Sequence, residues 1–182
     1  MGEEAVTKEL TQLHFQNTFK PIYSSTLSKQ EMGQVIKLHL FLKLKCDATI
    51  KERMVTGGNK QHGYIPKEEA AAPTASLELM MLTSVIDAQE GYNVAIADIP
   101  NAFIQTHLTQ DDDKVVMQLH GPLVILLVDL APEVYGLYLK INKNRLPVFY
   151  IHVLNALYGL IKVALLYYQH FVATIPKWDC QS

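Results

Sequence analysis

One aspartate stands at a position where a carboxylate could bind a metal ion. Asp98 continues the apolar run Tyr92–Ile99, which Pro100 follows. The run predicts a β-strand, on which Asp98 shares a face with Val94 and Ile96. A carboxylate on an apolar face is costly to bury unless it is paired, and at a strand end it can hold a hard cation through its oxygens. The strand alone leaves a second interpretation open, a solvent-exposed aspartate that caps the next segment.

Charge is unevenly distributed along the chain. Residues 1–67 carry ten Lys and Arg against six Asp and Glu, whereas residues 68–182 carry six against twelve. A basic front half and an acidic back half would suit a phosphate-contacting region joined to a metal-binding one. Ordinary variation of surface charge explains the same counts, so charge alone does not decide between the two.

A β-hairpin with basic side chains is expected early in the chain. Residues 40–45 alternate apolar with basic residues, and residues 50–55 have the composition of a returning strand. The glycine pair 57–58 breaks regular structure, and Lys60 follows it. The Walker spacing and its Ser or Thr are missing, so the sequence does not support a phosphate-cradling loop of that kind.

Helices and further strands are expected around these segments. Apolar side chains recur at helical spacing over residues 3–15, 30–39, 73–90 and 157–175. Short apolar or alternating runs predict strands over residues 114–119 and 123–130, and a hairpin of residues 136–141 and 147–153. With 49% hydrophobic and 19% charged residues, the composition is that of a globular protein. We therefore expect an α+β fold.

Two other groups of potential ligands predict no metal site. Cys46 and Cys180 lie far apart without metal-ligand spacing, which favours free thiols in a reducing, intracellular compartment, cytoplasmic or nuclear. The acidic run at 111–113 lies in a polar loop and is interpreted as surface charge. The longest apolar run, Leu123–Val128, is far shorter than the roughly 18–20 residues needed to cross a bilayer, so no membrane partner is expected.

Four stretches occur in a characteristic order along the chain. They read Lys8-Glu9-Leu10 with Asn17-Thr18-Phe19, Lys51-Glu52-Arg53-Met54-Val55, Asp98-Ile99-Pro100-Asn101-Ala102-Phe103 and Leu157-Tyr158-Gly159-Leu160. The series resembles the reverse transcriptase domain of copia-type retrotransposon polyproteins. The later motifs of that family usually read Lys-Ala-Arg-Leu-Val-Ala, Asp-Val-Lys-Thr-Ala-Phe and Leu-Tyr-Gly-Leu-Lys-Gln. The resemblance runs from about residue 5 to residue 172; each motif is modest alone, and their order makes the series specific.

The resemblance implies a metal-binding role for Asp98. It matches the first metal-binding aspartate of the palm, and the backbone carbonyl of Ile99 would assist it. With two later aspartates it would hold the pair of Mg²⁺ ions that activates the primer 3′-hydroxyl and neutralises the leaving pyrophosphate. The activity implied is that of an RNA-directed DNA polymerase, a nucleotidyltransferase. Its partners would be an RNA or DNA template-primer and the remainder of the polyprotein.

Nucleotide-binding residues are implied in the same way. Lys51 and Arg53 match fingers residues that face the triphosphate, where cationic donors stabilise charge on the phosphates. The alternative is that both are solvated charges on a hairpin. Phe103 matches the aromatic residue under the incoming sugar, where its ring would clash with a 2′-hydroxyl, and simple core packing is its alternative. Lys162 occupies the position of a glutamine that faces the template and the nucleotide.

The chain departs from the family pattern at several positions. Pro100 stands where the family usually has Lys, and residues 161–165 read Ile-Lys-Val-Ala-Leu in place of Lys-Gln-Ala-Pro-Arg. A diverged branch of copia-like elements resembles the chain at both places. The Tyr-x-Asp-Asp string that supplies the second and third catalytic aspartates does not occur in this sequence. One carboxylate cannot hold two Mg²⁺ ions in near-octahedral oxygen ligation, so we expect neither a catalytic Mg²⁺ pair nor polymerase activity from this chain alone.

The resemblance also predicts how the chain is organised. Residues 1–90 would form a fingers-like subdomain, residues 91–175 a partial palm, and residues 176–182 a tail. Without the later palm strands, a sheet edge and apolar surface on the last helix should be exposed. A second hypothesis is a domesticated, non-catalytic module that keeps the basic hairpin to bind nucleic acid or a partner. It predicts binding that weakens steeply with added salt.

Overall fold

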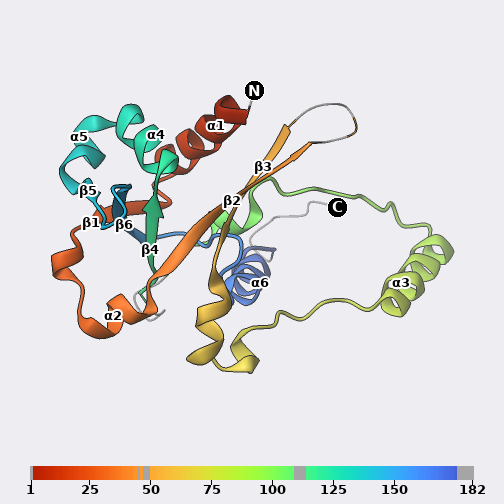
Figure 1. Cartoon of the computed structure of the whole chain (residues 1–182). Helices are drawn as coiled ribbons and strands as arrows, with labels where there is room; N and C mark the ends of the chain where they lie inside the picture. Colours follow the sequence, from red (N-terminus) through yellow and green to blue (C-terminus); the bar gives the residue numbers. More distant parts are fainter. Residues whose placement is uncertain (1, 45, 47–49, 109–113, 176–182) are drawn as a thin grey trace.

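Helices and a mixed β-sheet make up the protein, so the expected α+β class is confirmed (Figure 1). The computed structural model describes residues 2–44, 46, 50–108 and 114–175, with residues 42–44 and 50–53 described by their backbone alone. The helices are α1 (Gly2–Phe15), α2 (Lys29–Gln34), α3 (Leu77–Glu90), α4 (Pro122–Leu130), α5 (Pro132–Tyr135) and α6 (Val163–Thr174). The strands are β1 (Phe19–Ile22), β2 (Ile36–Leu44), β3 (Ile50–Thr56), β4 (Val116–His120), β5 (Lys140–Ile141) and β6 (Pro147–Val153).

The strands follow the order β1-β6-β4-β2-β3, and β5 pairs with one end of β6. β6 is antiparallel to β1 and β4, and β2 is antiparallel to β3 in the hairpin. A short parallel contact between β2 and β4, at Ile36–Lys37, joins the hairpin to the other strands. Strands from both sides of residue 90 therefore contribute to one sheet, and the division into fingers and palm at that residue stays a prediction.

Two helices bury one face of the sheet. The apolar stripe of α1, with Val6, Leu10 and Leu13 at helical spacing, lies in the core beside Val124 and Leu127 of α4. The strands contribute Met117, Leu119, Phe149, Ile151 and Val153, each at most 1% exposed. Within the part of the chain that the structure describes, no helix is long and apolar enough to cross a membrane.

Several expected elements are confirmed with small changes of boundary. The hairpin of β2 and β3, the strand β4 and the hairpin of β5 and β6 all lie where alternation placed them. α3 begins at the cap Ser76, whose Oγ accepts from the N–H of Leu79 at 3.2 Å, and ends at Gly91 with φ +71°. The predicted end at residue 90 is confirmed, whereas the helix begins at Leu77 rather than at residue 73.

The strand expected over residues 123–130 is wrong, because this run is the helix α4. A short continuous apolar run does not distinguish a buried strand from a buried helix by periodicity alone. Pro122 occupies the first turn, a position that proline tolerates because its missing N–H has no partner there. The buried residues Leu123, Val124 and Leu127 follow helical spacing, while Ile125 is half exposed.

Two helices begin or end elsewhere than expected. The helix predicted over 30–39 ends at Gln34, because the period-2 pattern of Ile36 and Leu38 already belongs to β2. The helix predicted from residue 157 begins at Val163 instead, and residues 157–162 form a turn. That turn lies at the junction described below.

The strand expected over Tyr92–Ile99 is not formed. The segment has no pairing partner among the described strands, and the side chains of Val94 and Ile96 are 69% and 98% exposed. An extended apolar segment becomes a strand only when a neighbour supplies a ladder of hydrogen bonds. Together with residues 70–76 it carries α3 away from the body of the protein, on the right of Figure 1.

Candidate functional site

The end of the β2–β3 hairpin is bonded directly to the turn after β6. The backbone N–H of Thr56 donates to the carbonyl oxygen of Tyr158 at 2.8 Å. The side chain of Gln61, only 3% exposed, accepts through Oε1 from the backbone N–H of Ile161 at 3.0 Å. Two segments 100 residues apart in sequence therefore form one junction.

Two glycines allow the backbones to come this close. Gly159 has φ +94°, and a β-carbon placed there would lie 2.4 Å from the carbonyl oxygen of Thr56. A β-carbon on Gly58 would collide with the carbonyl of Gly159 from the opposite side. The pair is thus needed for close backbone approach, which explains both the Gly57-Gly58 break and the glycine of the Leu-Tyr-Gly-Leu stretch.

The N-terminal stretch and the segment before the turn meet at a buried asparagine. The carbonyl of Thr18 accepts from the backbone N–H groups of Leu154 and Asn155 at 2.8 and 3.1 Å. The Asn155 amide donates to the carbonyl of Ile104 at 2.9 Å, and its Oδ1 lies 2.8 Å from Nδ1 of His107. The Asn155 side chain is 4% exposed, and both its oxygen and its nitrogen have a hydrogen-bond partner. It therefore ties the segment after Asp98 to the sheet.

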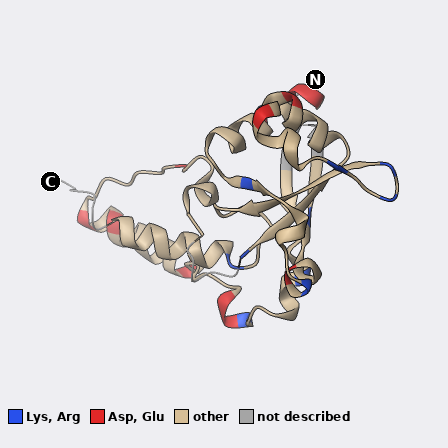
Figure 2. Ribbon diagram, turned by 90° about the vertical axis from the view of Figure 1, so that its left-hand side faces the viewer, with Lys and Arg blue, Asp and Glu red and all other residues tan. Residues whose placement is uncertain are grey.

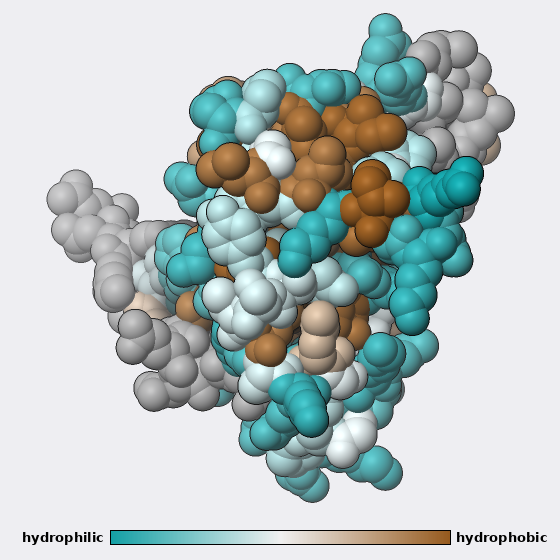
Figure 3. Space-filling model, turned by 60° about the vertical axis from the view of Figure 1, so that its left-hand side comes forward, coloured by the Kyte–Doolittle hydropathy of each residue, from teal (hydrophilic) through white to brown (hydrophobic). Residues whose placement is uncertain are grey.

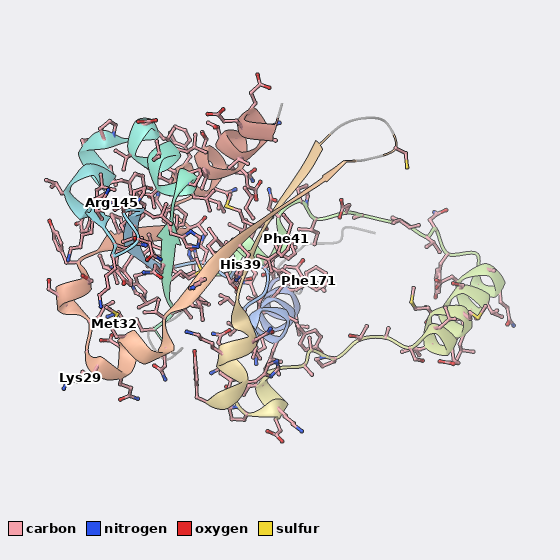
Figure 4. The ribbon with its side chains drawn as sticks, viewed as in Figure 1. Lys29, Met32, His39, Phe41, Arg145 and Phe171 are labelled. Carbon is pink, nitrogen blue, oxygen red and sulfur yellow. The ribbon has the colours of Figure 1, made fainter. Side chains whose placement is uncertain are left out.

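Phe103 lies on the short 3₁₀ turn η4 (Ala102–Gln105) beside the same junction. Its ring is half-buried and meets the rings of Tyr158 and Tyr167 edge-on, with centroids 4.9 and 5.6 Å apart. Tyr167 in turn stacks on Phe171 of α6, which Figure 4 labels near the centre of the molecule. In this structure Phe103 packs against the hydrophobic core, as its alternative interpretation expects; the role beneath a nucleotide sugar stays a prediction.

Among the described residues, Asp98 does not lie in a group of metal-binding side chains, and its role as a metal ligand stays a prediction. Its carboxylate is exposed in the extended segment before η4, and the following Ile99 is half-buried. Across the described ranges, no three His, Cys, Asp or Glu side chains lie close enough together to share a metal ion. The residues present therefore do not fit a pair of Mg²⁺ ions, which require several oxygen ligands at fixed geometry.

The cationic candidates lie on two sides of the junction. Lys51 and Arg53 belong to β3, but their side chains lie outside the described residues. The Lys162 ammonium lies 2.5 Å from the Glu69 carboxylate, at the start of α6. The structure therefore brings Phe103 and Lys162 to the Tyr158 turn, whereas Asp98 remains on its exposed segment.

The sheet face opposite α1 and α4 is polar and basic. Phe149 and Ile151 point into the core, so Tyr150 and His152 point to the other face. In register, His152 pairs with Lys20, and Gln118 pairs with both Tyr150 and Lys37. The amide of Gln118 donates to the Tyr150 hydroxyl at 3.0 Å. We call Lys20, Lys37, Gln118, Tyr150 and His152 the open sheet face.

Nearby charges shift the pKa of two ionisable groups at this face, His152 and Glu31. Burial lowers the pKa of His152, and the charges of Lys20 and Lys114 lower it further, while Glu31 opposes them. The Lys114 ammonium lies 2.6 Å from the Glu31 carboxylate, and this hydrogen bond and those from Ser28 lower the Glu31 pKa to about 2. Positive potential therefore dominates around His152. By contrast, Figure 2 shows acidic residues near the N-terminus, on α1, which carries Glu3 and Glu4 in its first turn.

An apolar pocket lies elsewhere, away from these residues. Its cavity volume is about 690 Å³, and its wall comes from α1, β2 and α4, with Val6, Leu38 and Leu123 among its residues. In Figure 3, apolar atoms gather in the upper half of the view, on the side where α4 and α5 lie. The pocket includes His39 and His120 at its edge but none of the predicted site residues, so we assign it no chemistry.

Residues that hold the junction together were not identified from sequence. Gln61 and Asn155 are polar side chains that become almost fully buried, and burial of a polar group depends on partners distant in sequence. Gly58 offered a weak signal as part of a glycine pair. For Asn155, a polar residue inside the apolar run from Pro147 to Leu157 was a usable signal, because such a residue needs a specific partner when buried.

Comparison of the chain with protein-family models, with curated proteins and with solved structures finds no match.

Proposed function

We propose that this chain is part of a copia-type retrotransposon reverse transcriptase, carrying fingers-like elements and the first part of the palm. The supporting observation is the convergence of the stretches that carry the resemblance. The carbonyl of Thr18, the end of β3 and η4 are all bonded to or packed on residues 154–160. Stretches that form one site in a common ancestor are expected to converge in this way, whereas four chance matches are not.

The chain on its own supplies binding rather than chemistry. In the proposal, the basic hairpin and the junction position template and nucleotide, with Phe103 and Lys162 beside the Tyr158 turn. Asp98 would supply one carboxylate of the catalytic set, and no other carboxylate of the described residues completes it. We therefore expect no nucleotide incorporation by this polypeptide, with the polymerase reaction belonging to the intact parent enzyme.

The exposed Asp98 segment has a direct explanation under this proposal. A palm strand needs a neighbouring strand, and the Tyr-x-Asp-Asp hairpin of the family is the expected neighbour. Its absence from the sequence leaves residues 92–98 without a ladder partner, which is consistent with their exposure. The segment before η4 is then a strand that has no partner in the described chain.

Sequencing the genomic DNA beyond codon 182 tests the origin of the chain most directly. The proposal expects a Tyr-x-Asp-Asp coding string in one of the reading frames, followed by ribonuclease H-like sequence. A long stretch of unrelated host sequence in all frames would count against the proposed origin. Adding the recovered segment to the chain should then restore Mg²⁺-dependent primer extension, which an Asp98→Asn substitution should abolish.

The alternative, a non-catalytic nucleic-acid-binding module, is favoured by the basic open sheet face and hairpin. Fluorescence anisotropy with an RNA–DNA hybrid should show affinity that falls steeply between low and physiological salt. Replacing Lys51 and Arg53 with Gln should reduce the slope of log K against log salt by about 1–2. The matched control replaces Lys143 and Arg145, in the turn before β6, with Gln and should leave the slope unchanged. Salt-independent binding would rule out the module.

A further inference from the structure

α3 is a well-capped helix whose apolar side chains have no cover. Leu77, Met81 and Val85 are 66%, 63% and 63% exposed, and no residue of this helix is buried. Among the described residues it packs extensively against no other element. Figure 4 shows its side chains standing clear of the body. A helix with so many exposed apolar side chains marks an interaction surface.

One side of α3 has the pattern of a helix–helix contact. Leu77, Met81, Val85 and Ala88 are spaced four, four and three residues apart, so they form one stripe along the helix. We call these four residues the α3 seam. Thr83 lies on the opposite side of the helix from Val85, because two residues correspond to about 200° of rotation.

α6 carries a matching stripe that is also uncovered. Tyr168, Val172 and Ile175 are 37%, 46% and 43% exposed, and half-buried Leu165 continues the same line. Their spacing of three, four and three residues is that of a helix-packing seam. The two seams are therefore similar in length, about 16 Å on α3 and about 15 Å on α6, since they span eleven and ten residue steps of 1.5 Å. We call these four residues the α6 seam.

Charge favours α6 over a second α3 as the partner of α3. α3 carries Glu78 beside its seam, with Asp87 and Glu90 in its last turn, and it has no basic residue. Two α3 helices packed antiparallel would bring these carboxylates together, which is unfavourable. α6 has no Asp, Glu, Lys or Arg, so an α3–α6 contact creates no like-charge pair.

The connecting segments hold α3 away from the α6 of its own chain (Figure 1). Residues 70–76 include Pro73, and residues 91–101 end at Pro100 and Asn101, with extended backbone between. Proline fixes its own backbone angle and favours extended geometry before it, so each arm is stiffened at its proline. A second molecule can meet the exposed helix without refolding them.

We propose that two copies of this chain form a dimer by exchange, in which the α3 seam of each copy packs on the α6 seam of the other. Exchange of an identical element closes a two-fold dimer with two equivalent contacts. Each copy contributes both seams, which expose apolar area on the order of 700 Å², close to the ~800 Å² per partner of a standard interface. The inference does not depend on the reverse transcriptase assignment.

Analytical ultracentrifugation of the full chain tests the association. The chain should be dimeric at micromolar concentration, and Val85→Lys or Val172→Lys should weaken the dimer at least tenfold by placing a charge in either seam. Thr83→Lys adds the same charge on the opposite side of α3 and should leave the dimer intact. A monomeric chain, or equal effects of Val85→Lys and Thr83→Lys, would overturn the proposal.

Disulfide trapping decides which helices meet. Both native cysteines are first replaced by Ser, and Val85→Cys and Val172→Cys are then placed in separate, differently tagged chains. Mild oxidation of the mixture should give a heterodimer containing one chain of each kind. Covalent dimers from Val85→Cys alone would show α3–α3 pairing instead. A doubly substituted chain that forms its disulfide within one monomer would show closure onto its own α6, and either result would refute exchange.

Discussion

Two regions of this protein have similar apolar content but opposite environments. Residues 154–160 lie where the sheet, the N-terminal stretch and the hairpin end meet, and most of their side chains are buried. α3 and the Asp98 segment are also rich in apolar residues, and they remain largely exposed. The difference shows that local signals suffice to form a helix, whereas burial requires a partner surface.

Matched leucine truncations provide the largest expected contrast. Leu127→Ala, on the buried side of α4 at 0% exposure, should lower the free energy of unfolding by about 3 kcal/mol, since it removes methyl groups and leaves a cavity. Leu82→Ala, at 57% exposure on α3 and outside its seam, should cost less than about 0.5 kcal/mol. Urea denaturation followed by circular dichroism measures both. Equal losses would mean that α3 is packed in solution.

The glycine junction can be broken by a single methyl group. Gly159→Ala should cost at least about 2 kcal/mol, because φ +94° is unfavourable for alanine and its β-carbon would meet the Thr56 carbonyl. The control is Gly33→Ala in α2, where nothing lies within 4 Å, and it should be neutral or stabilise by about 0.5 kcal/mol. The same denaturation series measures them. A harmless Gly159→Ala would contradict the close backbone contact.

The open sheet face should make stability depend on pH through His152. Its folded pKa lies below the ordinary 6.5, so the unfolded chain takes up a proton first as pH falls. The stability contributed by neutral His152 is therefore present above pH 6.5 and is lost as pH falls through the folded pKa. Thermal melts between pH 7.5 and 5 should show a smaller decrease in Tm for His152→Gln than for the unsubstituted chain. Glu31, whose folded pKa is about 2, stays ionised in the folded protein across this pH range.

The smallest effect is expected at the surface ion pair beside the junction. Lys162 and Glu69 are partly exposed, with side chains 22% and 43% accessible, so their coupling should be below about 1 kcal/mol. A double-mutant cycle with Lys162→Met and Glu69→Gln measures it. A larger coupling would indicate that the pair is shielded from water and helps fix the Tyr158 turn.

Sequence patterns predicted which helices and strands form better than they predicted which of them find a partner surface. The hairpin of β2 and β3 follows from the alternation of apolar and polar residues, and α3 follows from helical spacing, both of which act within a few residues. The strand predicted at α4 was wrong because a run of six consecutive apolar residues fits either a buried strand or a buried helix. The Asp98 strand failed because a strand is a property of two segments, and its partner is not in the described sheet.

The residues of the candidate site were likewise identified from sequence only in part. Phe103 and the Leu-Tyr-Gly-Leu stretch were identified from residue types in order, and the structure places them in contact. Gln61 and Asn155 could not be identified, since their importance comes from hydrogen bonds to Ile161 and Ile104, far away along the chain. The roles of Lys51, Arg53 and Asp98 stay predictions.

By itself, the sequence determined the α+β class, the basic hairpin, the C-terminal end of α3 and the order of motifs that supports the proposed origin. Each of these depends on spacing and chemistry within a short window. Only the tertiary structure decided that residues 18, 56, 103 and 155 surround one turn, and that α3 is uncovered. Those outcomes depend on which distant surfaces are available to exclude water and to pair with backbone groups, and no short window contains that information.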